Sequence, residues 1–106
     1  MAIAITNDNF NTEIEAHKGP IVVDIYASWC GPCQQMAPIF EDLEKELSNE
    51  YKFAKINVDD ARDISIKFGI TSVPTFLFLN HGEVKGKETG YMSKEDLKAK
   101  LQQYLG

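Results

Sequence analysis

Residues 21–33 read IVVDIYASWCGPC, an apolar run followed by two cysteines with two residues between them. The first part, from Ile21 to Tyr26, is rich in β-branched residues and almost wholly apolar, which is typical of a strand buried on both faces of a sheet. From Cys33 to about Leu47, apolar residues recur at the spacing of one helical face. The stretch therefore predicts a buried strand that leads through the cysteines into the N-terminus of a long helix.

Length and composition limit the class of protein. The chain has 106 residues, of which 43% are hydrophobic and 25% charged, the balance of one globular domain that we expect to cover residues 1–106. A chain of this size buries enough surface to fold without a metal or a disulfide. The net charge of −5 comes without a basic cluster, and no apolar run could span a bilayer. We therefore expect a monomer that binds neither nucleic acid nor membranes.

The first six residues, MAIAIT, lack the basic start, the long apolar stretch and the cleavage site of a secretory signal, which predicts a cytoplasmic protein. Thiols are kept reduced in that compartment. Two cysteines separated by two residues are therefore expected to be reactive or metal-binding rather than structural.

The remaining elements follow from the same kinds of pattern. Asn7 is expected to cap a helix that carries Phe10 and Ile14. Pro38 removes one backbone hydrogen bond of the long helix and is expected to kink the helix rather than end it. Further strands are predicted at residues 2–5, 53–58, 75–79 and 83–89, and further helices at residues 61–68 and 94–105, the last capped by Ser93. The order predicts an α/β protein with a mixed central sheet of about five strands sandwiched by about four helices.

The cysteines are predicted to lie where a strand ends and a helix begins, which is where open α/β sheets place their sites. Two intervening residues put the sulfurs within bonding reach of each other. The unpaired N–H groups and the dipole of the helix N-terminus favour a negative sulfur, so Cys30 is expected to be a thiolate nucleophile. Pro32 suits the first helical turn, where no N–H is needed.

Other interpretations of these residues exist. A zinc site would need further ligands, and the only histidines are His17 and His81, both in distant predicted turns. A structural disulfide across two residues would constrain very little of the unfolded chain. Asp24 could be a buried carboxylate held by backbone donors. Alternatively, burial in an apolar strand would raise the pKa of Asp24 by desolvation and suit it to proton exchange near neutral pH.

Several motifs, at their expected distances, resemble the thioredoxin family over essentially the whole chain. The residues that carry the resemblance are the WCGPC segment at 29–33, Pro38, Lys55, Pro74 within Val-Pro-Thr, Gly82 and Gly90. The resemblance implies the thioredoxin fold and an enzyme that reduces protein disulfides. It implies no bound cofactor beyond a redox-active Cys30–Cys33 disulfide, and partners that include a thioredoxin reductase, which recharges the pair from NADPH, and disulfide-containing substrate proteins.

The resemblance also assigns roles. Cys30 would attack the substrate disulfide, and Cys33, lying deeper, would resolve the mixed disulfide. Asp24 would exchange the proton, with Lys55 as its buried partner. In similar proteins the residue matching Pro74 is cis and faces the cysteines, which leaves the preceding backbone free to pair with a substrate strand. The implied docking residues are Trp29, Gly31, Pro32, Val73, Pro74 and Gly90.

Three residues near the site depart from the family pattern. Tyr26 stands where many members have a second tryptophan, Gln34 where bacterial members usually have a lysine, and Tyr91 where a small residue is usual. A non-catalytic binding subunit on the same fold remains an alternative, as does a disulfide-forming oxidase or isomerase. Gly31 and Pro32 between the cysteines favour the reductant, because these residues tune the stability of the thiolate.

Overall fold

The structure is a computed structural model that describes residues 2–106, so Met1 lies outside it. The described residues form a five-stranded sheet in the order β1, β3, β2, β4, β5. Strands β1, β3 and β2 are parallel, whereas β4 and β5 run antiparallel to their neighbours. The bounds are β1 Ile3–Ile5, β2 Pro20–Tyr26, β3 Lys52–Asn57, β4 Thr75–Asn80 and β5 Glu83–Thr89. The predicted mixed α/β sheet is confirmed, and the apolar run that ends at Tyr26 is its central strand.

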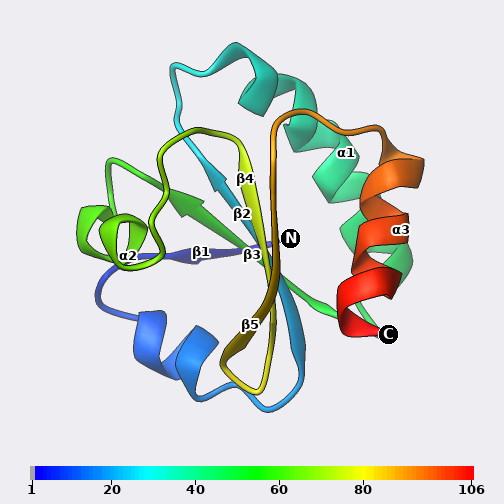
Figure 1. The fold of residues 1–106 in the computed structure, drawn as a ribbon, viewed down its shortest axis with the longest axis horizontal. Helices are drawn as coiled ribbons and strands as arrows, with labels where there is room; N and C mark the ends of the chain where they lie inside the picture. Colours follow the sequence, from blue (N-terminus) through cyan, green and yellow to red (C-terminus); the bar gives the residue numbers. More distant parts are fainter. Residues whose placement is uncertain (1) are drawn as a thin grey trace.

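Helices cover both faces of this sheet (Figure 1). The bounds are η1 Asn11–Glu15, α1 Gly31–Leu47, α2 Arg62–Lys67 and α3 Lys94–Leu105. α1 and α3 pack on one face through residues such as Phe40 and Leu97, and η1 and α2 pack on the other through Ile14 and Ile64. Among the residues described, no helix is long and apolar enough to cross a membrane.

Strand β2 is buried on both faces because each helical layer takes alternate side chains. Ile21, Val23 and Ile25 belong to the core cluster under η1 and α2, and Val22 belongs to the cluster under α1 and α3. Side chains alternate along a strand, so Asp24 points to the same face as Val22. That face is the one that the N-terminal end of α1 covers.

The expected cap at Asn7 is wrong. No side chain caps η1, a short segment in which the Ala16 N–H donates to the Asn11 carbonyl, five residues back. Asn9 is instead the residue that fixes the turn, since its side chain accepts from the Thr6 N–H at 2.8 Å and donates to the Ala4 carbonyl at 2.9 Å. Local side-chain bonds of this kind compete with a helix start.

A two-residue turn closes the hairpin of β4 and β5. His81 and Gly82 both have positive φ, 52° and 76°, the conformation that tight hairpin turns need. A Cβ atom at Gly82 would lie 2.7 Å from the Glu15 carbonyl oxygen, so only glycine fits beneath η1. The edge hairpin is therefore fixed both by its own turn and by contact with the first helix.

Three connections meet at one end of the sheet, at the top of Figure 1: residues 27–30 after β2, residues 71–74 before β4, and residues 90–93 after β5. The antiparallel pairing of β2 with β4 and of β4 with β5 requires this arrangement. The long helix α1 starts from the same place and runs on through Pro38 without ending. Residues that lie far apart in the sequence are thus brought to the start of one helix.

Candidate active site

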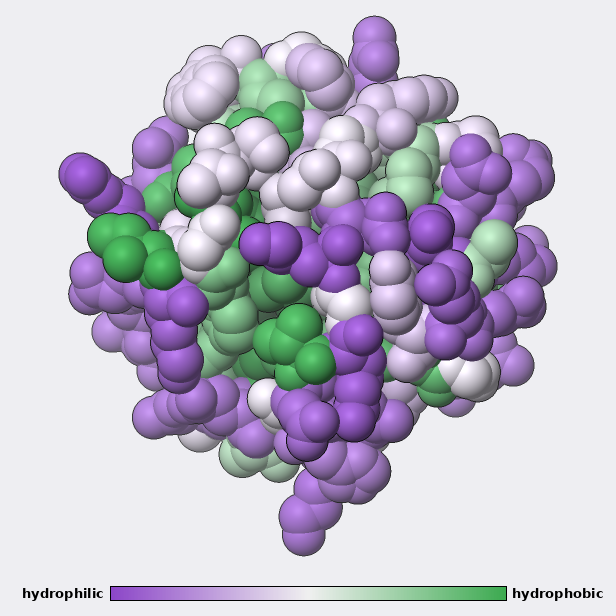
Figure 2. All heavy atoms as spheres, in the orientation of Figure 1, coloured by the Kyte–Doolittle hydropathy of each residue, from purple (hydrophilic) through white to green (hydrophobic). Residues whose placement is uncertain are grey.

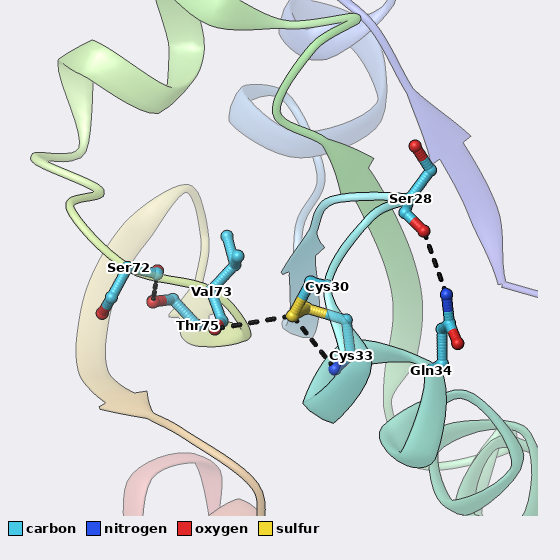
Figure 3. The surroundings of a disulfide bond; sticks show 7 residues. All are labelled: Ser28, Cys30, Cys33, Gln34, Ser72, Val73 and Thr75. Atoms are coloured by element: carbon cyan, nitrogen blue, oxygen red, sulfur yellow. Dashed lines mark hydrogen bonds between the residues drawn. A yellow bond between two sulfur atoms is a disulfide. The ribbon is translucent and has the colours of Figure 1, made fainter.

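Cys30 and Cys33 form a disulfide at the start of α1, with their Cα atoms 5.2 Å apart (Figure 3). Cys30 is the N-cap residue of α1, in an extended conformation, and Cys33 lies in the first helical turn after Gly31 and Pro32. The predicted apolar face begins at Cys33, and the helix starts at Gly31 with Pro32 in its first turn, as expected for this proline. The redox-active disulfide is therefore present, and it lies at the predicted junction of strand and helix.

The sulfur of Cys30 is itself the cap of α1. The backbone N–H of Cys33 donates to Cys30 Sγ at 3.1 Å, and the N–H of Gln34 donates to the Cys30 carbonyl at 3.2 Å. The first N–H groups of a helix have no partner within the helix and carry its positive end. The Cys33 N–H and the positive end of the helix therefore stabilise negative charge on Cys30 Sγ once the disulfide is opened.

The loop before β4 approaches the same sulfur. The Val73 carbonyl oxygen lies 3.7 Å from Cys30 Sγ, and the Val73–Pro74 peptide bond is cis, as the resemblance implied. A disulfide sulfur carries no hydrogen, so this approach is a contact in the oxidised form and an available hydrogen bond for a Cys30 thiol. Val73 makes no backbone–backbone hydrogen bond within residues 2–106, because β4 starts only at Thr75.

Gly90 lies in the third of the connections at this end of the sheet, the loop after β5. Its N–H donates to the Pro74 carbonyl at 2.9 Å, which ties the loop after β5 to the loop before β4. Gly90 has a φ of 95°, and a Cβ atom there would meet nothing within 4 Å. The backbone of Gly90 is thus not covered by other atoms on the side where a side chain would lie, while Pro74 itself is buried.

The two cysteines have nearly the same exposed fraction, 6% for Cys30 and 5% for Cys33. Burial alone therefore does not show that Cys33 lies deeper. The two cysteines differ in their access to a cleft of about 740 Å³ beside the disulfide: Cys30 lines this cleft and Cys33 does not. The predicted docking residues that line this cleft are Trp29, Gly31, Pro32 and Val73, whereas Pro74 and Gly90 lie outside its lining.

The opposite wall of the cleft comes from α2 and was missed in the sequence. Ile66 and Arg62 line it, and the Ile66 side chain is 73% exposed, close to the 71% of Trp29 on the other side. Figure 2 shows a small group of strongly hydrophobic atoms projecting at the side of the molecule where Figure 1 places α2. The signal was available, since Ile66 is out of phase with Ile64, the apolar residue that α2 buries together with Ser65.

Asp24 is the buried carboxylate of the site. Its side chain is 1% exposed, and its Oδ1 atom has no hydrogen-bond partner. Burial raises the pKa of Asp24 to about 6, and the nearby Lys55 charge partly opposes this rise. The prediction of a raised pKa caused by desolvation is confirmed, and the interpretation of Asp24 as a carboxylate held by backbone donors is not supported at Oδ1.

Lys55 differs from the expectation of a buried partner. It lies directly opposite Asp24 on the adjacent parallel strand β3, but its side chain is only half-buried. Within residues 2–106, Asp24 and Lys55 form no ion pair shorter than 4.0 Å. The Lys55 ammonium group lies instead 5.0 Å from the centroid of the Tyr26 ring.

The other two departures are Gln34, in the first turns of α1, and Tyr91, in the loop after β5. The Gln34 side chain folds back onto the preceding loop, where Nε2 donates to the Ser28 carbonyl at 3.1 Å (Figure 3). Tyr91, beside Gly90, is 53% exposed. As for a metal, the described residues contain no group of three or more His, Cys, Asp or Glu side chains that could hold one.

Comparison with known proteins agrees with this geometry. The family model described as thioredoxin matches residues 1–103. The chain is 40% identical to Thioredoxin H4 of Arabidopsis thaliana over 104 residues, which cover 95% of this chain and 87% of that protein. It is 35% identical to a thioredoxin of Bacillus subtilis over 103 residues, 97% of each chain. It is 36% identical to a thioredoxin of Rickettsia felis over 97 residues, 92% of each chain.

Proposed function

The chain belongs to the thioredoxin family, and we propose that within this family's reaction Cys30 is the nucleophile and Cys33 the resolving thiol. The protein is a thiol–disulfide oxidoreductase with protein-disulfide reductase activity, and its redox centre is the Cys30–Cys33 pair. One observation supports the division of roles: Cys30 borders the cleft and its sulfur accepts the Cys33 N–H, while Cys33 does not reach the cleft.

The reaction consumes one substrate disulfide and forms the Cys30–Cys33 disulfide. The Cys30 thiolate attacks one substrate sulfur, the substrate S–S bond breaks, and the departing substrate thiolate takes a proton. Cys33 then loses its proton and attacks Cys30 Sγ, which releases the second substrate thiolate to be protonated in turn. The substrate gains two electrons and two protons, and the Cys30–Cys33 pair loses them.

Asp24 is the proposed proton acceptor for Cys33. A carboxyl group with a pKa of about 6 is ionised enough at neutral pH to take a proton and acidic enough to return it. Lys55 belongs to the same proposal as the charge that limits how far burial raises the pKa of Asp24. Both residues act from β2 and β3, beneath the first turn of α1.

Substrate docking is proposed for the surface around Cys30. An extended substrate segment would pair with the free backbone of Val73, a mode of binding in which main-chain groups supply affinity and side-chain contacts supply specificity. Trp29, Gly31 and Pro32 would contact it from one side, and the bare backbone of Gly90 with the adjacent Pro74 from the other. The exposed Ile66 extends this docking surface across the cleft.

The family implies a reductase and substrate proteins as partners. We propose that a thioredoxin reductase returns two electrons from NADPH to the Cys30–Cys33 disulfide, and that no other cofactor takes part. We further propose that residues 1–106 act as one domain and as a monomer, in a cytoplasmic setting. A compartment that keeps thiols reduced would favour the dithiol form that this reaction needs.

Reduction of insulin, driven by dithiothreitol, tests this proposal with matched variants. The wild-type protein is expected to accelerate the reaction, and Cys30→Ser and Cys33→Ser are each expected to abolish the acceleration. After a single encounter with a disulfide substrate, Cys33→Ser should hold a mixed disulfide through Cys30, detectable by mass spectrometry. Cys30→Ser should not.

Absence of acceleration by the wild-type protein would contradict the proposed turnover and favour a binding role. Trapping by Cys30→Ser rather than by Cys33→Ser would reverse the two assignments.

A further inference from the structure

Four side chains surround Asp24 on its face of the sheet. Val22 and Tyr26 lie two residues away on β2, while Lys55 on β3 and Phe76 on β4 are its register partners. Val22 and Phe76 are fully buried, whereas Tyr26 and Lys55 are half-buried. Of these four neighbours, Tyr26 and Lys55 are the ones in contact with water.

The helices over this face add no fixed charge. α1 places Cys33, Met36 and Phe40 in the buried layer, and α3 places Leu97 and Leu101 there. Cys33 is the one titratable group among these buried residues, and it does not ionise while the disulfide is closed. The Lys55 ammonium group is thus the charge that acts on Asp24 in the oxidised protein.

This ammonium group has two possible partners and lies near one of them. Its distance to the centroid of the Tyr26 ring is 5.0 Å, within the range of a cation–π contact. Its distance to the Asp24 carboxyl exceeds the 4.0 Å limit of an ion pair. Lysines elsewhere in the described chain do reach carboxylates, as Lys52 reaches Glu13 at 2.9 Å and Lys98 reaches Glu46 at 2.9 Å.

We propose that the Tyr26 ring holds the Lys55 ammonium group away from Asp24, and that Tyr26 is thereby a positioning residue for the carboxyl group that exchanges the proton. Attraction to the ring face competes with attraction to the carboxylate, and the half-buried ring also shields Asp24 from water. A closed ion pair or free entry of water would stabilise the ionised carboxylate. Either change would weaken its ability to take a proton from Cys33.

The inference rests on the proton exchange proposed for Asp24, but its geometric part can be measured separately. In the oxidised protein, the pH titration of the Asp24 carboxyl carbon can be followed by NMR in the wild type, Tyr26→Phe and Tyr26→Leu. Tyr26→Phe keeps the ring and is expected to leave the pKa of Asp24 unchanged. Tyr26→Leu frees the ammonium group and admits water, so the pKa of Asp24 should fall by about one pH unit.

Removal of the Lys55 charge tests whether the ammonium group causes the expected fall in the pKa of Asp24. Lys55→Met is expected to raise the pKa of Asp24 in both backgrounds, and by more in Tyr26→Leu, where the ammonium group lies closer to the carboxylate. The wild-type protein gives an independent measurement, because the ring current of Tyr26 should shift the ε-methylene protons of Lys55 upfield, and this shift should persist in Tyr26→Phe.

An unchanged or raised pKa of Asp24 in Tyr26→Leu would overturn the proposal. So would a wild-type protein in which the Lys55 ε-methylene protons have the chemical shift of a free lysine. The rate at which the reduced protein resolves a mixed disulfide separates the inference from the function. If the pKa falls in Tyr26→Leu but the pH dependence of resolution does not move, the positioning stands and proton exchange by Asp24 is contradicted.

Discussion

The burial of Asp24 makes the stability of the protein depend on pH in a way that one substitution can isolate. Asp24→Asn replaces the carboxyl with an uncharged group of similar shape. The pKa of Asp24 rises from 3.8 to about 6 on folding, because burial penalises the charged form. This rise is about two pH units, and each unit corresponds to about 1.4 kcal/mol, so ionised Asp24 costs the fold about 3 kcal/mol.

The sign of the pH dependence follows from whether Asp24 loses its proton first in the folded or in the unfolded protein. Below about pH 4 the carboxyl is largely protonated in both states, and its burial carries no charge penalty. Between about pH 4 and 6 the unfolded chain ionises while the folded protein keeps its proton, so folding loses stability as the pH rises. Above about pH 6 both states are ionised, and the penalty stays constant.

Urea unfolding of the oxidised proteins, followed by the fluorescence of the single tryptophan, measures this penalty. The difference in free energy of unfolding, Asp24→Asn minus wild type, is expected to grow by about 2 to 3 kcal/mol between pH 4 and pH 8. Any constant effect of the amide cancels in this comparison. Asp42→Asn, at an exposed position of α1, controls for the loss of one negative charge. A difference that stays flat across this range would refute the reasoning.

Two further substitutions test the turn and the cleft. In urea unfolding, Gly82→Ala should lower the free energy of unfolding by about 1 to 3 kcal/mol more than Gly69→Ala does. Both glycines have positive φ, but only Gly82 lies against a carbonyl oxygen. Equal losses in the two variants would contradict this reasoning. Ile66→Ser should lower kcat/KM for insulin about fivefold, as expected for roughly 1 kcal/mol of lost apolar contact, and leave reduction of a small disulfide unchanged. The matched control is Val84→Ser, because Val84 is an exposed apolar side chain outside the cleft. An equal loss of kcat/KM in Val84→Ser would contradict the proposal that substrates dock against α2.

The main elements were predictable because each carries a strong local pattern. The central strand is an apolar run, interrupted only by Asp24, that ends at Tyr26. The last helix is capped by Ser93, whose side chain accepts the Asp96 N–H at 3.1 Å. The apolar periodicity of α1 begins only at Cys33, but Pro32 indicated a first turn before it, because proline is favoured at the first positions of a helix. Asn9 was missed because its side-chain hydrogen bonds run backwards, to Ala4 in the preceding strand and to Thr6 just after it, rather than forwards to a helix.

Parts of the site depend on what covers each strand, and the sequence does not show this. Asp24 stood out as the one charge in an apolar run, so its burial could be predicted. Lys55 occupies the corresponding position of β3, yet it remains half-buried and its ammonium group lies near Tyr26. Ile66 was interpreted as part of a short helix, and only the packing of α2 beside the disulfide loop makes it a cleft residue.

The sulfur that reacts is also the sulfur that caps α1, and this dual role affects both chemistry and experiment. Cys30 Sγ keeps lone pairs for the Cys33 N–H whether it is a thiolate, is bonded to a substrate or is bonded to Cys33, so the helix can keep its first turn through the whole cycle. Cys30→Ala would remove the nucleophile and the cap together. Cys30→Ser replaces the sulfur with one of the strongest capping groups known, so any loss of turnover reports on the chemistry rather than on a frayed helix.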